Sequence, residues 1–330
     1  MSPKLAIWAL TIAVQGLYCV ALAQQPNRPM PRIGFIFSSG SPTDPSPQGD
    51  SFKRRLDDLG YIEGKNVLIE RRYAEGKLER MSPFVQEFVK EKVDAIIGVN
   101  NVVIRAAKEA TKTIPIVMIS SLDPVAAGYV ETFARPGGNI TGLAWLSRDL
   151  SAKRLEILRD LLPKASRIGI LWDADGPGPA VAFKEYSAAA QGFKLDIVSL
   201  SVRGPNPDLA VAFQSGKKAN IDALIVVANP LIGQRTKQIF DLATKNRIPS
   251  MTEEGRYVEA GGLISYGPSL ADLYSRVAEF VVEILKGAKP GDLPVKLASK
   301  FEIRINLKTS QQLGIVVPQH LLVQADKVIK

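Results

Sequence analysis

Residues 32–42 read RIGFIFSSGSP, an uninterrupted apolar run closed by a loop of small residues. A run that is apolar on both faces predicts a strand buried inside a parallel sheet, because a strand with one face in water would alternate. The amphipathic stretch 52–59 follows, and Gly60 supplies the glycine typical of a helix C-terminus. Strand, loop and helix in this order predict the first unit of an α/β fold.

The same alternation continues through the first half of the chain. Expected strands cover residues 67–70, 93–99, 114–119 and 140–143, and expected helices cover 78–92, 102–112 and 124–134. Successive parallel strands must be joined by crossover connections, which are right-handed in nearly all proteins. We therefore predict a doubly wound parallel sheet covered by helices.

The pattern restarts after residue 145, and four short segments return in the same order. RIG at 32–34 returns at 167–169, VDAII at 93–97 returns as IDALI at 221–225, IP at 114–115 returns at 248–249, and GGNIT at 137–141 returns as GGLIS at 261–265. Each match alone is short, but four in one order indicate two copies of one structural unit.

Two further elements follow the second copy, an amphipathic stretch at 269–287 and an apolar run at 301–306. Since both copies are complete by then, we expect these elements to pass back between the lobes as a hinge. The predicted fold class is therefore α/β, with two doubly wound parallel-sheet lobes joined by a multi-crossing hinge. The predicted boundaries are residues 31–145 plus about 267–290 for lobe 1, and 146–266 plus about 300–330 for lobe 2.

The N-terminus has the three parts of a secretory signal peptide. A short positive segment precedes the apolar run 5–14, and Ala21 and Ala23 form a small-x-small site before a polar stretch. We expect residues 1–23 to be a cleaved signal peptide, so that the mature protein is periplasmic and has no membrane insertion. Two alternatives stay open: retention of the apolar segment as an anchor, and lipidation of Cys19.

Composition excludes several classes of protein. Hydrophobic residues make up 46% and charged residues 23%, which excludes a disordered, fibrous or polytopic membrane protein. One cysteine and one histidine exclude a disulfide framework and a cysteine zinc site, and leave little basis for histidine-dependent catalysis. The formal net charge is +9, but the basic residues alternate with acids and lack interleaved aromatics, so we predict no nucleic-acid partner.

Signals for catalysis are weak. The glycine-lysine pairs at 64–65 and 216–217 lack the upstream glycine and the Ser/Thr of a phosphate-binding loop. Segment 176–178 lacks the third glycine of a dinucleotide turn, and no G-x-S-x-G sequence is present. We predict no catalytic residue, no metal and no cofactor.

Polar residues follow the expected strands at the ends where parallel sheets bind ligands. Helix N-termini at these ends favour an anion such as a carboxylate, while acidic side chains suit an ammonium group. Helix capping is the alternative for the serines, asparagines and Asp123, and core or hinge packing is the alternative for the aromatic residues. The predicted ligand-binding residues are Ser38, Ser39, Gly40, Ser41, Asn100, Asn101, Ser121, Asp123, Trp145, Asp173, Asn229, Glu253 and Tyr266.

Several longer motifs resemble the ABC transporter substrate-binding protein family with a type I periplasmic binding protein fold, which includes tryptophan-binding-type members. The carriers are DPV at 123–125 and ARPGGNITG at 134–142, with LGYIEGKN at 59–66, YAEGKLER at 73–80 and KRLE at 153–156. The resemblance covers nearly the whole mature chain. It implies a monomeric binding protein, not an enzyme, that captures a small molecule between its lobes and delivers it to an ABC permease.

The resemblance leaves the ligand open. An amino acid is the leading prediction, and whether its side chain is aromatic stays open. The loop after the third strand reads VNNV at 99–102, where the family pattern expects a Gly-Thr-Pro-like turn, so specificity is not taken from any relative. Two other functions remain as alternatives: a ligand-sensing subunit that docks on a membrane receptor, and an enzyme of the cell envelope.

Overall fold

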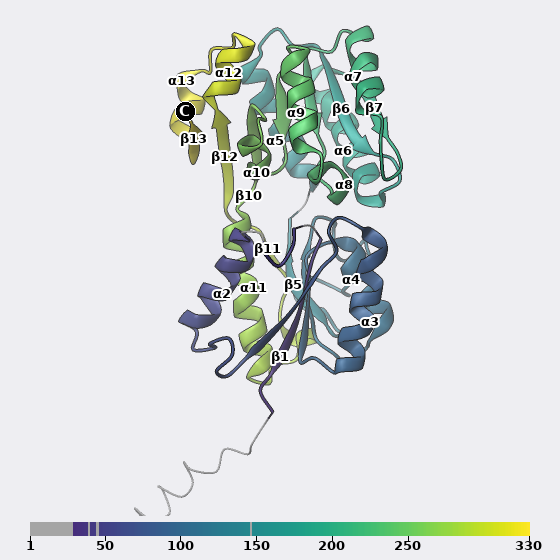
Figure 1. The fold of residues 1–330 in the computed structure, drawn as a ribbon, viewed down its shortest axis with the longest axis vertical. Coiled ribbons are helices and arrows are strands. Elements are labelled where there is room, and N and C mark those ends of the chain that lie inside the picture. The colour runs from purple at the N-terminus through teal and green to yellow at the C-terminus, as the bar shows by residue number, and fades with distance from the viewer. Residues whose placement is uncertain (1–28, 39, 44–45, 146) are drawn as a thin grey trace, which may run out of the picture.

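Two lobes lie one above the other along the longest axis of the molecule (Figure 1). The structure, a computed structural model, describes residues 29–330 apart from positions 39, 44–45 and 146. The expected signal peptide and Cys19 lie outside the described residues. Within the described part of the chain, none of the helices is long and apolar enough to cross a membrane.

The lobe that begins the chain, lobe 1, is built on a parallel sheet with the strand order β11-β5-β4-β3-β1-β2. Its strands are β1 (Arg32–Phe37), β2 (Leu68–Tyr73), β3 (Ala95–Gly98), β4 (Ile116–Ser120), β5 (Ile140–Ala144) and β11 (Lys296–Leu297). Its helices are α2 (Pro47–Asp58), η1 (Leu78–Arg80), α3 (Met81–Glu91), α4 (Asn101–Ala110), α11 (Leu270–Leu285) and η2 (Pro290–Asp292). Every residue of β3, β4 and β5 is buried, as their continuous apolar runs predict.

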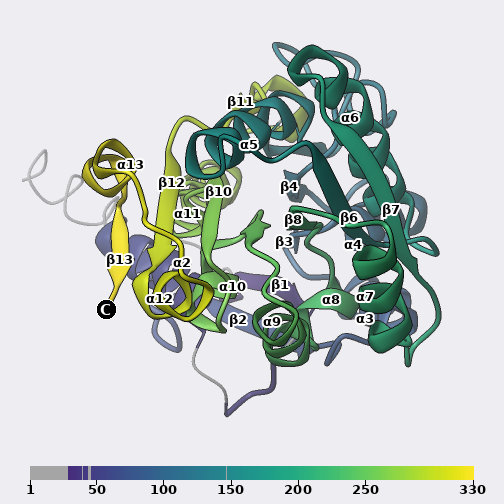
Figure 2. The same cartoon turned by 90° about the horizontal axis from the view of Figure 1, so that it is seen from above.

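The second lobe, lobe 2, has a sheet of order β13-β12-β10-β9-β8-β6-β7. Its strands are β6 (Arg167–Asp173), β7 (Asp196–Val202), β8 (Ala223–Val226), β9 (Ser250–Thr252), β10 (Ile264–Pro268), β12 (Phe301–Asn306) and β13 (Lys327–Ile329). Its helices are α5 (Ser147–Leu161), α6 (Pro177–Phe193), α7 (Leu209–Lys218), α8 (Pro230–Gly233), α9 (Thr236–Lys245), α10 (Gly255–Glu259), α12 (Leu307–Leu313) and α13 (Gln319–Gln324). Seen from above, β12 and β13 lie at the opposite side of this lobe from β7 (Figure 2).

The lobes share one topology. The order β5-β4-β3-β1-β2 in lobe 1 corresponds to β10-β9-β8-β6-β7 in lobe 2, which confirms the predicted duplication. Two repeated aspartates make the same contact in both lobes. Asp94 Oδ2 accepts a hydrogen bond from the backbone N–H of Arg32 at 2.7 Å, and Asp222 Oδ2 accepts one from that of Arg167 at 2.9 Å.

The chain passes from one lobe to the other three times, between β5 and α5, between β10 and α11, and between β11 and β12, and these passages form the hinge. Helix α11 returns to lobe 1, where it lies beside α2 (Figure 1) and Glu279 accepts a hydrogen bond from Arg55 at 2.8 Å. Strand β12 returns to lobe 2 and pairs antiparallel with β10, so the parallel sheet of lobe 2 carries one antiparallel pairing. Strand β10 ends at the hinge and β12 starts there, so β12 runs through lobe 2 in the direction opposite to β10.

The helix expected at 124–134 is wrong, since the structure has turns in this segment. The side chain of Asp123 accepts hydrogen bonds from the N–H groups of Val125 and Ala126 and starts one turn. Gly128, with a φ of +68°, leaves the right-handed region, so a helix cannot continue through it. Helix α2 starts at Pro47, before the expected residue 52, because Ser46 caps it and proline is favoured in the first turn.

Candidate functional site in the cleft between the lobes

A cleft of about 1030 Å³ lies between the lobes. Loops that follow β1, β3 and β4 of lobe 1 line one wall, and loops that follow β6, β8 and β9 of lobe 2 line the other. These are the carboxyl ends of the strands, where α/β sheets bind ligands, and the volume is at the upper end of the roughly 300–1,000 Å³ usual for small-molecule sites. The predicted residues that line the cleft are Ser38, Gly40, Ser41, Asn100, Asn101, Ser121, Trp145, Asp173, Asn229 and Glu253.

The structure places two predicted residues away from the cleft lining. The carboxylate of Asp123 is occupied in capping its turn. The ring of Tyr266 stacks on Phe301 with 5.9 Å between ring centroids, beside the hinge. Ser39 lies outside the described residues.

Asn100 and Asn229 occupy corresponding places in the two lobes, after β3 and β8. Asn100 Oδ1 accepts hydrogen bonds from the N–H groups of Val102 and Val103, each at 3.0 Å, and Asn229 Oδ1 accepts one from Ile232 at 2.8 Å. Both amide oxygens therefore cap a helix. The amide nitrogens have partners too: Asn229 Nδ2 donates to Asp173 Oδ2 at 2.9 Å, and Asn100 Nδ2 contacts Met81 Sδ at 3.6 Å.

Asp173 ends β6, and only 4% of it is exposed. Its Oδ2 accepts a hydrogen bond from Asn229 Nδ2 at 2.9 Å, and its Oδ1 accepts one from the backbone N–H of Asp175 at 3.0 Å. Both donors are neutral, so they satisfy the oxygens without cancelling the charge. A cleft-lining carboxylate whose oxygens accept hydrogen bonds from neutral donors is suited to bind a cationic group of a ligand.

Arg154, which was not among the predicted residues, also lines the cleft on lobe 2, although only 1% of it is exposed. Its Nε donates to the carbonyl of Tyr266 at 2.7 Å, and its Nη1 donates to Tyr186 Oη and Glu253 Oε1, each at 3.0 Å. Burial alone would lower the pKa of Arg154, but Tyr186 and Glu253 outweigh it and raise the pKa, so the guanidinium stays charged. The motif KRLE at 153–156 contains this arginine, and it was the signal available in the sequence.

An aromatic wall on lobe 1 was also missed. Phe37 and Tyr73 end the neighbouring strands β1 and β2 and are direct partners in the parallel register. Their rings stack with centroids 5.0 Å apart and planes 12° apart, and Phe35 stacks behind Phe37 at 4.1 Å. Phe37 and Tyr73 both line the cleft and are partly exposed. The sequence signal for Phe37 was its position at the end of the first expected strand, whereas Tyr73 lay beyond the strand expected at 67–70 because β2 extends to residue 73.

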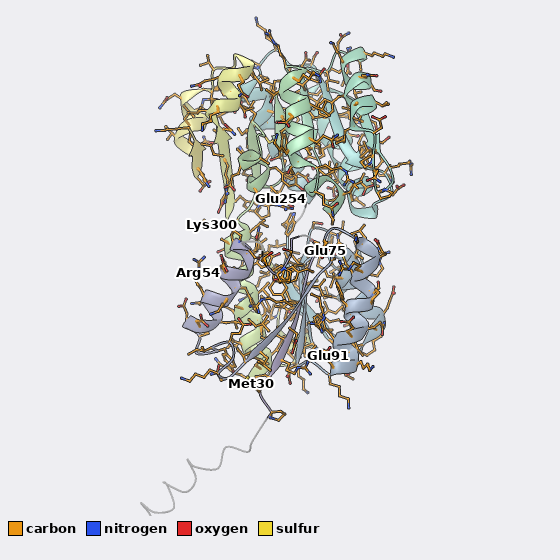
Figure 3. The ribbon with its side chains drawn as sticks, in the orientation of Figure 1. Met30, Arg54, Glu75, Glu91, Glu254 and Lys300 are labelled. Carbon is orange, nitrogen blue, oxygen red and sulfur yellow. The ribbon has the colours of Figure 1, made fainter. Side chains whose placement is uncertain are left out.

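A second charged pair, Glu254 and Arg256, lies on the wall of lobe 2. Figure 3 shows Glu254 at the lower edge of the upper lobe, facing the gap between the lobes. The charge of Glu254 raises the pKa of Arg256 further above its usual value, so the guanidinium of Arg256 stays charged. Among the described residues, no group of three or more His, Cys, Asp or Glu side chains could hold a metal ion.

Two lobes of one topology that enclose a cleft at the carboxyl ends of their strands define a periplasmic binding protein of type I fold. The chain belongs to the family described as "ABC transporter substrate binding protein", whose model matches residues 46–329. It is therefore a solute-binding protein of an ABC transporter, a class that binds its ligand without catalysis.

Three relatives are informative. A tyrosine-binding protein of Clostridioides difficile (strain R20291) is 31% identical over 266 residues, which cover 80% of this chain and 75% of the relative. The ABC domain from Streptococcus pneumonia in complex with L-Trp is 25% identical, with a TM-score of 0.81. A ligand-free, open substrate binding protein with adhesive properties from Clostridium difficile is 27% identical, with a TM-score of 0.68. Both structural alignments cover 91% of this chain and 99% of the other chain.

Proposed function

We propose that this chain is the periplasmic receptor of an ABC importer for an aromatic amino acid, which it binds in the cleft and delivers to a permease. The observation that carries the proposal is the stacked pair Phe37–Tyr73 on the cleft wall. A ligand ring placed on this wall would extend an existing stack. Offset or edge-to-face aromatic pairs at about 4.5–7 Å each contribute about 0.5–1.5 kcal/mol beyond the area they bury.

The polar residues of the cleft suit the two charged groups of an amino acid. In lobe 2, the charge of Glu253 is neutralised by Arg154, whereas Asp173 is held by neutral donors. We therefore assign the ligand ammonium group to Asp173. In lobe 1, Ser38 directly after β1 and Asn101 at the start of α4 offer neutral donors to the ligand carboxylate.

The relatives support the same class of ligand. One structure contains L-Trp, and one protein is named for tyrosine. Their ligands differ in ring size and in a hydroxyl group, so the relatives favour an aromatic side chain without choosing between the two. The signal peptide predicted at 1–23 and the membership of an ABC transporter family support a periplasmic location and a permease partner.

A thermal-shift panel on the mature chain, refolded to remove bound ligand, tests the proposal. The panel contains L-tryptophan, L-tyrosine and L-phenylalanine, with L-leucine, L-glutamate and D-glucose as comparison ligands. A ligand at a hundred times its Kd adds about 2.7 kcal/mol of stability. At roughly 2–4 °C per kcal/mol, an aromatic amino acid should raise Tm by several degrees. A response confined to the sugar or to the non-aromatic amino acids would contradict the proposal.

A further inference from the structure

A hydrogen bond joins the two lobes across the cleft, through a side chain that itself lines the cleft. Gln234, directly after α8 in lobe 2, donates from Nε2 to the backbone carbonyl of Glu75, two residues after β2 in lobe 1, at 2.6 Å. We propose that Gln234 and the turn at Glu75–Gly76 form a latch, which holds the lobes closed and slows release of the ligand.

The turn presents the carbonyl of Glu75 in a fixed direction. The N–H of Lys77 donates to the carbonyl of Ala74 at 2.8 Å, and φ is positive at both central residues, +52° at Glu75 and +75° at Gly76. Positive φ at both positions is the pattern of a type I′ turn. The N–H of Gly76 also donates to the carbonyl of Ser38 at 2.6 Å. The latch is thus tied to the Ser38 loop, which lines the cleft.

The missing side chain of Gly76 makes room for the amide of Gln234. A Cβ added to Gly76 would lie 1.2 Å from Gln234 Nε2 and 2.2 Å from Gln234 Cδ. Even a methyl group at this position would have to displace the amide from its hydrogen bond. Gly64 is a matched comparison, because its φ is +79° and an added Cβ would meet nothing within 4 Å.

The latch lies far from the hinge. Strand β2 is at one edge of the lobe 1 sheet, whereas β5 and β11, from which hinge segments leave, are at the other. Figure 3 shows Glu75 at the upper end of lobe 1, on the other side of the view from Lys300 in the hinge. A rotation about the hinge therefore separates Gln234 from Glu75 over a long lever arm, so their hydrogen bond favours the closed form.

A bond formed only in the closed form shifts the closed–open equilibrium by its own free energy. Its loss should therefore speed ligand dissociation by about three- to tenfold and leave association nearly unchanged.

The test is stopped-flow measurement of the dissociation rate of L-tryptophan and L-tyrosine. We expect this acceleration in Gln234→Ala and in Gly76→Ala. The controls are Gln238→Ala, an exposed glutamine on α9, and Gly64→Ala, which carries the same backbone strain without touching the latch. Dissociation rates equal to those of the controls would overturn the latch.

A second measurement tests the latch without a ligand. Cγ of Gln234, where the sulfur of a cysteine would lie, is 3.0 Å from the ideal Cβ at Gly76. The chain's single cysteine, Cys19, is removed when expression starts at residue 24. The double variant Gly76→Cys/Gln234→Cys should then form an intramolecular disulfide under mild oxidation, and Gly64→Cys/Gln234→Cys should not. If neither L-tryptophan nor L-tyrosine binds, the proposed ligand class fails, and formation of the disulfide then tests the latch by itself. If the variant Gly76→Cys/Gln234→Cys formed no disulfide, the latch proposal would be overturned.

Discussion

The guanidinium of Arg154 and the carboxylate of Glu253 lie 3.0 Å apart, with 2% and 13% of their side chains exposed. The second oxygen of Glu253 accepts a hydrogen bond from the N–H of Ala228 at 2.9 Å. Arg154 therefore connects the loop after β9 with the loop after β8 and, through Tyr266, with the end of β10. One buried side chain fixes the shape of the cleft wall of lobe 2.

Removing this arginine should destabilise lobe 2. Arg154→Met leaves Glu253 with an uncompensated buried charge, and loss of one partner of a buried pair costs about 3–5 kcal/mol. Urea unfolding followed by circular dichroism measures the change. The control is Arg159→Met on the exposed side of the same helix. The double variant Arg154→Met/Glu253→Gln should recover part of the loss, because the unpaired charge is gone. Equal stabilities of the two single variants would rule out this role.

The charge of Asp173 should make the binding affinity depend on an amino group in the ligand. Asp173→Asn keeps the shape of the side chain but removes its charge, so the affinity for L-tryptophan should fall about ten- to hundredfold. The affinity for indole-3-propionate, which lacks the amino group, should hardly change. Calorimetric titration of both compounds measures the difference. Asp175→Asn is the control, since Asp175 pairs with Arg203 at the surface. If both compounds lost affinity equally, Asp173 would not hold the ammonium group.

The aromatic wall should contribute specifically to binding. Tyr73→Leu keeps an apolar side chain but removes the stack with Phe37, so the affinity for an aromatic amino acid should fall about two- to tenfold. Lobe 2 offers a matched control in the stacked pair Trp172–Phe183, with centroids 4.8 Å apart and planes 12° apart. Phe183 is not among the described residues that line the cleft, so Phe183→Leu should leave the affinity unchanged. An equal affinity of Tyr73→Leu and the wild type would contradict this assignment.

The stability of lobe 2 should depend on the ionisation of Asp222. Burial would raise the pKa of this carboxyl, but hydrogen bonds from Ser166 and Arg167 outweigh it and lower the pKa. Because the folded-state pKa is lowered, the stabilisation is present above the unfolded pKa of about 4 and is lost as the pH falls through the folded value. Asp222→Asn should therefore be less stable than the wild type by about 1 kcal/mol at pH 7, after allowance for solvent screening.

The difference between these two proteins should shrink as the pH falls from 5 to 2. Urea unfolding at several pH values measures it. The control is Asp241→Asn, which affects an exposed i,i+4 pair with Lys237 and should change stability by only about 0.3–0.5 kcal/mol. A difference that is independent of pH would show that the charge of Asp222 does not stabilise the lobe.

The sequence predicts the fold well because the deciding signals are local and repeated. Buried parallel strands are continuous apolar runs, and the return of segment 93–97 at 221–225 brings Asp94 and Asp222 to the same place in both lobes. The turns at 124–134 were missed because capping by Asp123 resembles a helix start, whereas Gly128 stops the helix one turn later.

The site was only partly predictable for a different reason. Residues at strand ends could be located from the strand pattern, and ten of the thirteen predicted residues line the cleft. Arg154 and Gln234 could not be found in this way, since each acts on partners distant in the sequence. Gln234 meets Glu75 over a separation of 159 residues, and no local pattern marks either residue for that contact.

Isothermal titration calorimetry of the mature, ligand-stripped chain with L-tryptophan and L-tyrosine tests the central claim most directly. We predict saturable binding of at least one of them with a stoichiometry of one, together with a negative heat-capacity change from burial of the ring between the lobes. L-Leucine and D-glucose should give no binding under the same conditions. Saturable binding of the sugar or of L-leucine, with no heat from either aromatic amino acid, would contradict the account.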